Sequence, residues 1–207
     1  FFYTTDYIFE EKLARIPLWT KPALGGCLVG VIGLFFPDAL GVGYETIGKA
    51  LQGDLILGPL LVLLALKFLT TSLTIGSGGS GGFFAPSLFM GAALGGAFGN
   101  FARDFLPGIV SPPGAFALVG MGALVAATTH APLTAMLIIF EITGSYHIIL
   151  PLMFATILAV IVARSVEVES IYSLKLARQG IRLHHGRDLS VLEKISVSQI
   201  MRTDYDF

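Results

Sequence analysis

Charged residues are scarce in this sequence. Asp, Glu, Lys and Arg make up 13% of its 207 residues and hydrophobic residues 54%, whereas charged residues make up roughly 25% of an average soluble domain. So few charges cannot cover the surface of a water-soluble domain of this length, and much of the surface is expected to face lipid. The formal net charge is −1, which gives no basis for binding nucleic acid.

Cysteine is almost absent. Cys27 stands alone, which excludes a disulfide within the chain and a zinc site built from cysteines. We interpret His184 and His185 as a solvated pair rather than metal ligands, and no cofactor is expected. The sequence also lacks an initiating Met and a signal peptide, and it stops within what reads as a new element. We therefore expect a piece of a longer chain.

Three long runs contain no Asp, Glu, Lys or Arg: 68–102, 105–140 and 142–163. Runs of this length indicate membrane-embedded segments, but Gly and Pro interrupt them repeatedly. Cutting the chain at these breaks predicts helices over about 1–14, 22–36, 44–51, 58–75, 84–105, 114–127, 132–142, 147–163 and 170–179. Several are shorter than the roughly 20 residues that a membrane span needs.

Broken helices at membrane depth are tolerated only where protein buries them or where they line a cavity. The pattern therefore favours the interior of a transporter or channel over a simple membrane anchor. Gly91, Gly95 and Gly99 recur at four-residue spacing, as do Gly26 and Gly30, which predicts close helix packing.

The stretch 74–99 (TIGSGGSGGFFAPSLFMGAALGGAFG) carries the chemistry. Its glycines allow positive φ and close approach to a ligand, and Pro86 fits the first turn of a helix. The amides of Phe83 and Phe84 are then expected to point outward at a helix start, which carries about half a positive charge. Such a tip binds an anion. Because the stretch has no Lys or Arg, the anion is held weakly enough to pass on.

Two other interpretations of these glycines do not fit the sequence around them. Gly76, Gly78 and Gly81 fit the G-x-G-x-x-G dinucleotide fingerprint, but that motif needs a preceding strand and an acid about 20 positions later. Here a long apolar segment precedes it and the next acid is Asp104. A Walker loop is also excluded, because no Gly-Lys-Ser/Thr follows. The remaining alternative is a tight turn between packed helices.

Residues 82–86 (GFFAP) resemble the GxFxP signature of the CLC chloride channels and transporters. Residues 120–127 (GMGALVAA), 130–134 (HAPLT) and 140–144 (FEITG) resemble later helices of that family in the same order, and 37–45 (PDALGVGYE) resembles prokaryotic members. The resemblance runs from residue 1 to about 180. It implies an all-α, multi-pass membrane protein with broken and tilted helices, the second half of an inverted-repeat fold.

The resemblance also implies a chloride site. The family binds chloride with the two backbone amides that correspond to Phe83 and Phe84, in a loop supported here by Gly81, Gly82 and Pro86. A tyrosine hydroxyl from the family's last helix corresponds to Tyr172, whose alternative role is an interfacial anchor. The serine and gate glutamate of the family's first half do not occur in this sequence, nor does the internal proton glutamate. Channel and proton-coupled exchanger therefore stay open, with the prokaryotic character favouring an exchanger.

Several single residues have competing interpretations. Glu141 lies between apolar runs and is expected to bond to a loop backbone, with proton transfer as the alternative. Lys67 is expected to snorkel to an interface, and His130 to cap or pack at a helix break. The family is dimeric, which implies an interface through helices 132–142 and 147–163, with Leu137, Ile138, Ile148 and Ile149 suited to it.

The composition changes after residue 163, where basic residues gather, and this end is expected to be cytoplasmic. We expect a transmembrane domain over 1–180, then a linker and the start of a second domain over 181–207. Residues 195–201 (ISVSQIM) resemble the start of a CBS domain, a module that binds adenine nucleotides. The prediction is chloride transport through the cell membrane, with chloride, protons and lipid as partners and no enzymatic activity. The alternatives are a transporter for another small anion or solute, and a structural membrane module without transport.

Overall fold

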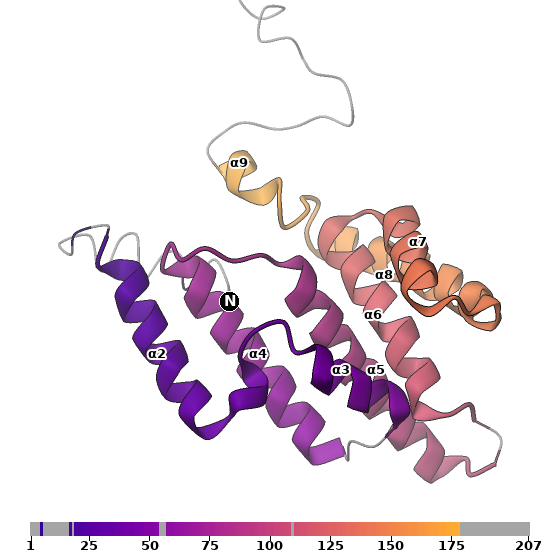
Figure 1. Ribbon diagram of the computed structural model, residues 1–207. Helices are drawn as coiled ribbons and strands as arrows, with labels where there is room; N and C mark the ends of the chain where they lie inside the picture. Colours follow the sequence, from indigo (N-terminus) through magenta and orange to yellow (C-terminus); the bar gives the residue numbers. More distant parts are fainter. Residues whose placement is uncertain (1–4, 6–16, 18, 54–56, 109, 179–207) are drawn as a thin grey trace, which may run out of the picture. The chain divides into compact units, whose positions relative to one another are not determined.

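The computed structural model describes residues 5, 17, 19–53, 57–108 and 110–178, and that part of the chain contains helices and no strand (Figure 1). The chain divides into two compact units, Phe1–Val166 and Glu167–Phe207. The linker and CBS start expected over 181–207 lie outside the described residues. The helices of the first unit are α2 (Lys21–Phe35), η2 (Pro37–Ala39), α3 (Tyr44–Gln52), α4 (Leu57–Gly76), α5 (Phe84–Phe105), α6 (Pro113–Thr129), α7 (Pro132–Thr143), η3 (Tyr146–Ile148) and α8 (Ile149–Val166).

The helix boundaries confirm most of the sequence prediction, because Gly and Pro do break the helices. Gly53 and Gly144 take the left-handed conformation at the ends of α3 and α7. His130, with φ of 58°, does the same at the end of α6, as expected of a residue at a helix break. The helix expected over 1–14 lies almost entirely outside the described residues.

The last expected helix, 170–179, is shorter in the structure. Only Leu174–Arg178 forms a helix, α9, in the second unit. The hydroxyls of Ser170 and Ser173 hydrogen-bond to each other and to each other's backbone amides at 3.0–3.3 Å. Such local bonds offer the backbone a turn in place of a helix, which delays the helix start to Leu174.

Helices α5 and α6 form the centre of the first unit (Figure 1). Helix α4 packs on α5 and on α2, α3 lies against both α5 and α6, and α7 and α8 pack on α6. Glycines bring α5 and α6 together: a Cβ on Gly91 would lie 2.5 Å from the Gly120 carbonyl oxygen, and one on Gly95 would lie 2.1 Å from the Phe116 carbonyl oxygen. The prediction of close packing through small residues is confirmed here. For Gly26 and Gly30 it stays a prediction, because no described atom lies within 4 Å of their Cβ positions.

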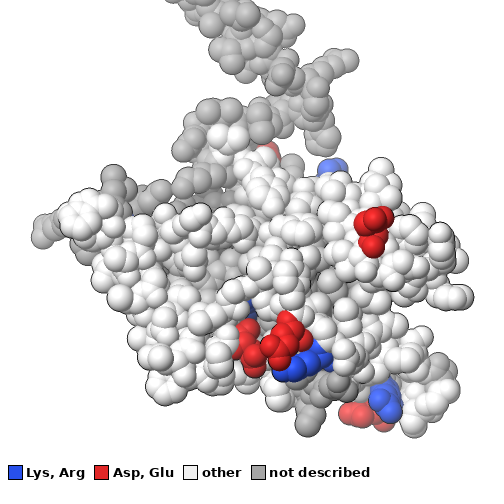
Figure 2. Space-filling model, in the orientation of Figure 1, with Lys and Arg blue, Asp and Glu red and all other residues white. Residues whose placement is uncertain are grey.

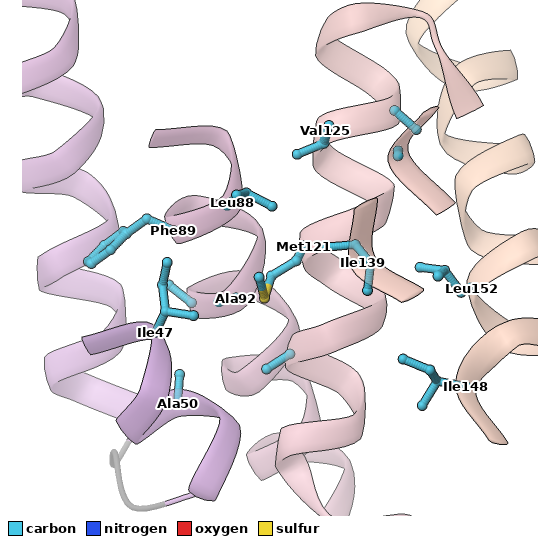
Figure 3. Close-up of a cluster of buried hydrophobic side chains, with 14 of the residues drawn as sticks. Ile47, Ala50, Leu88, Phe89, Ala92, Met121, Val125, Ile139, Ile148 and Leu152 are labelled. Carbon is cyan, nitrogen blue, oxygen red and sulfur yellow. The ribbon is translucent and has the colours of Figure 1, made fainter. Parts of the chain in front are cut away.

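A single hydrophobic cluster runs through these contacts (Figure 3). Phe89 of α5 points toward α4, Met121 of α6 lies between Ala92 and Ile139, and Leu152 of α8 closes the cluster on its far side. Phe89, Ile139 and Leu152 are each 1% exposed, so this cluster fixes α5 relative to its neighbours.

Most of the surface outside the hydrophobic cluster is apolar and suited to contact with lipid. Two helices, Gly58–Gly76 and Tyr146–Val166, are long and apolar enough to cross a membrane, and α2, α6 and α7 are shorter apolar helices. Charged side chains occupy a few small groups on an otherwise uncharged face (Figure 2). The described chain includes an exposed Glu45–Lys49 pair on α3, where a 2.8 Å hydrogen bond from the ammonium lowers the pKa of Glu45.

We expect Gly95→Ala to destabilise the first unit by about 1–3 kcal/mol, because the new methyl group would overlap the α6 backbone. Gly26→Ala, which adds the same atom where no described neighbour is present, should leave stability unchanged or raise it by up to about 1 kcal/mol. Thermal unfolding in detergent measures both. Equal melting temperatures for the two variants would contradict the α5–α6 contact.

Candidate anion-binding site

A glycine-rich turn connects α4 to α5. Gly78 has a φ of +84°, and a Cβ on Gly79 would lie 2.7 Å from the Thr74 carbonyl oxygen, to which the Gly79 amide donates a 2.9 Å hydrogen bond. A Cβ on Gly81 would lie 3.2 Å from the Ile75 side chain, which is closer than an ordinary van der Waals contact. Gly82 has neither constraint, because its φ is not positive and no described atom lies within 4 Å of its Cβ position.

Helix α5 begins directly after this turn. Phe83 is its N-cap, and the carbonyl of Phe83 accepts hydrogen bonds from the Ser87 amide at 3.0 Å and the Ser87 hydroxyl at 2.7 Å. Pro86 lies in the first turn, as predicted, and has no amide hydrogen to satisfy. The amides of Phe84 and Ala85 precede the first intrahelical bond and donate to no described residue. The tip therefore presents backbone donors with the positive end of the helix dipole behind them.

The tip of α5 faces a cleft of about 470 Å³. Three segments form its walls: the turn and tip at 80–82 and 84–86, one face of α4, and the loop at 39–42, with Val29 of α2 beside them. No Asp or Glu is among the described residues that line this cleft. The surroundings of the tip thus offer hydrogen-bond donors and apolar surface, which suits an anion.

Lys67 of α4 lines the same cleft, and the expectation that it snorkels to an interface is wrong. Its side chain is 2% exposed. The ammonium donates hydrogen bonds to the carbonyl of Ala39 at 3.2 Å and to the carbonyl of Gly41, and it lies 5.0 Å from the centre of the Phe89 ring. These carbonyls and the ring take the place of water, so the ammonium stays inside the protein.

The sequence analysis missed the polar face of α4. Lys67, Thr70, Thr71 and Thr74 all line the cleft. Their spacing of three, four and seven residues places them on one face of an otherwise apolar helix. That spacing was visible in the sequence and is the signal that could have identified this wall.

Tyr172 belongs to the second unit, so its expected place beside the tip of α5 stays a prediction. The residue precedes α9 and is 55% exposed. Its turn is organised by Ser173, whose hydroxyl donates to the Glu169 carboxylate at 2.7 Å and also contacts Ser170.

Other interpretations of the sequence find no support in the described chain. Gly76 is the last residue of helix α4, and a helix rather than a strand leads into the motif, so the dinucleotide fingerprint lacks its required context. Within the described ranges no cluster of His, Cys, Asp and Glu could hold a metal ion. Glu141 is exposed on α7, and no hydrogen bond joins it to a described loop backbone, so its structural role stays a prediction.

Comparison with known proteins gives consistent matches. The family described as "Voltage gated chloride channel" matches residues 1–164. A ClcB-like chloride channel protein of Ralstonia nicotianae is 42% identical over 164 residues, which cover 79% of this chain and 38% of that protein. The H(+)/Cl(-) exchange transporter ClcA of Vibrio cholerae is 42% identical over 170 residues, covering 82% of this chain and 36% of the transporter.

The fold has a solved counterpart as well. The crystal structure of a slow cyanobacterial Cl-/H+ antiporter matches with a TM-score of 0.74 and 31% identity, over 86% of this chain and 43% of that one. This chain spans under half the length of the relatives it matches. The GFFAP tip, the order of the helices and these matches agree, and the chain belongs to the voltage-gated chloride channel family.

Proposed function

We propose that the complete protein carries chloride across a membrane and that the tip of α5 is one of its chloride-binding positions. The observation that carries this proposal is the start of α5: the Phe84 and Ala85 amides donate to no described residue and face a cleft without described acids. The family resemblance adds the Phe83 amide and the Tyr172 hydroxyl to the coordination shell.

The physical basis is a balance between dehydration and release. A helix start offers about half a positive charge and several oriented N–H groups, in surroundings of low dielectric constant. These donors replace part of the hydration shell of chloride without trapping it as a contacting cation would. Neutral donors also suit a ligand that must leave again on the other side.

Proton-coupled exchange is the favoured form of this transport. The Vibrio cholerae relative is named an H(+)/Cl(-) exchange transporter, and the cyanobacterial protein of the same fold is a Cl-/H+ antiporter. A passive chloride channel is the second candidate, since the Ralstonia nicotianae relative carries that name. Neither process makes or breaks covalent bonds in its cargo, so we propose no enzymatic activity.

We further propose that the protein lies in the cell membrane as a homodimer, with its C-terminal end in the cytoplasm. Leu137 on α7 is 66% exposed and available for the interface implied by the family. Ile148 is not, because it is 8% exposed within the core of its own chain. Basic residues beyond α8 support the cytoplasmic assignment.

The direct test uses the complete open reading frame, purified and reconstituted into liposomes loaded with chloride. We expect chloride efflux that drives protons in the opposite direction, measured with a chloride electrode and a pH electrode. Chloride efflux without proton movement would establish the channel. If chloride did not move at all, the proposal would be rejected.

Gly82 gives a sharper test of the site. Nothing in the described chain requires glycine there, yet Gly82 lines the cleft, so a methyl group would reduce the space for an anion. We expect Gly82→Ala to fold normally and to weaken chloride binding, measured by calorimetry in detergent. Gly79→Ala is the matched control and should lower the melting temperature, because its methyl group would overlap the Thr74 carbonyl. Unchanged chloride affinity in Gly82→Ala would count against an anion at this tip.

Tyr172→Phe tests the hydroxyl predicted from the resemblance. Loss of one hydrogen bond of roughly 1–2 kcal/mol should weaken chloride binding by about 5–30-fold while leaving the ring in place. Tyr146→Phe removes the hydroxyl of a tyrosine that is 75% exposed and packs on Phe140, and it should leave chloride affinity unchanged. Equal affinities in the two variants would assign Tyr172 to membrane anchoring instead.

A further inference from the structure

The cleft contains a basic side chain, Lys67 of α4, that the backbone site does not account for. Lys67 is 2% exposed, and the carbonyls of Ala39 and Gly41 are its only hydrogen-bond acceptors within the described ranges. The one salt bridge found between described residues joins Glu45 and Lys49 on α3. No described carboxylate therefore neutralises the Lys67 ammonium.

Two carbonyls stabilise an ammonium by hydrogen bonding but do not neutralise its positive charge. Their dipoles replace the hydrogen bonds of water, while the net charge of the group remains. In a protein interior embedded in lipid, screening is weak and the field of this charge extends across a cleft. The most favourable neutralising partner is a mobile anion in the cleft.

The walls around Lys67 fit this partner. Its helix and the tip of α5 line the same cleft, so the ammonium and the Phe84 and Ala85 amides contribute to one potential. Thr71 lies one turn further along α4, half-buried, and its hydroxyl bonds to no described residue. The carbonyls of Ala39 and Gly41 accept hydrogen bonds from Lys67, which reduces the negative potential of that wall.

The same contacts give Lys67 a mechanical role. The loop at 39–42 forms the wall of the cleft beside α4, and the ammonium bridges two of its carbonyls. The ring of Phe89, 1% exposed within the core, lies 5.0 Å from the ammonium and helps to hold it in place. The Lys67 ammonium therefore has a defined position, because Phe89 and the hydrophobic cluster around it are fixed.

We propose that Lys67 is a positioning residue for chloride: its buried, unneutralised charge concentrates the anion in the cleft at the tip of α5 and sets the apparent affinity of transport. This inference rests on the proposed function. It differs from a purely structural role, in which Lys67 only fastens the loop, because it requires the charge itself and not merely a folded loop.

The test compares Lys67→Met with Lys67→Arg in the reconstituted complete protein. Lys67→Met keeps the length of the side chain but removes the charge, and it should raise the chloride concentration for half-maximal flux by about 5–30-fold, with a smaller change in the maximal rate. Lys67→Arg keeps the charge and should restore most of the affinity. Lys49→Met, the same substitution on the exposed surface of α3, should leave the half-maximal concentration unchanged.

A second pair of variants keeps the proposal testable if Lys67→Met fails to fold. Thr71→Glu places a negative charge on the same wall with Lys67 intact and should raise the half-maximal chloride concentration, whereas Thr71→Gln should do so much less. The proposal is overturned if folded Lys67→Met transports with unchanged half-maximal concentration, or if the two Thr71 variants behave alike. Absence of chloride flux in the unmodified protein would instead reject the proposed function.

Discussion

A helix that begins inside a membrane leaves amides without acceptors, and hydrocarbon cannot supply any. This constraint applies to the start of α5, where Phe84 and Ala85 donate to no described residue. Such a start is stable where protein buries it or where it lines a cavity, and here the glycine turn, the α4 face and the 39–42 loop form a cleft beside it. The cleft thus accommodates the start of the broken helix, and it is also the proposed chloride site.

The position of the tip depends on packing further along the helix. The glycine contacts between α5 and α6 fix the two backbones at close distance, and the hydrophobic cluster around Phe89 and Met121 fixes their neighbours. At the tip itself, the Thr128 hydroxyl of α6 lies 3.4 Å from the Ser87 hydroxyl, and Ser87 donates to the Phe83 carbonyl. Packing in the middle of α5 is therefore linked to the orientation of the amides at its end.

The features that the sequence predicted correctly are those that depend on neighbouring residues in the chain. Helix ends followed the Gly and Pro breaks, and Pro86 took its place in the first turn of α5. The start of α9 was misjudged because side-chain bonds between Ser170 and Ser173 compete with the helix. The environment of Lys67 was misjudged for another reason: the carbonyls that bind it lie 28 and 26 residues earlier in the chain, so only the folded structure brings them together.

In the proposed mechanism the cleft meets two requirements that a single cation in contact with the anion could not meet together. Attraction from a distance needs net charge, while rapid release needs weak contacts at the point of binding. Here the net charge is on Lys67, where two carbonyls and an aromatic ring hold it in the wall. The contacts at the tip come from neutral amides of α5. In this proposal the absence of Lys and Arg from 74–99 applies to the surface that contacts the anion, and the attracting charge comes from Lys67 on the preceding helix.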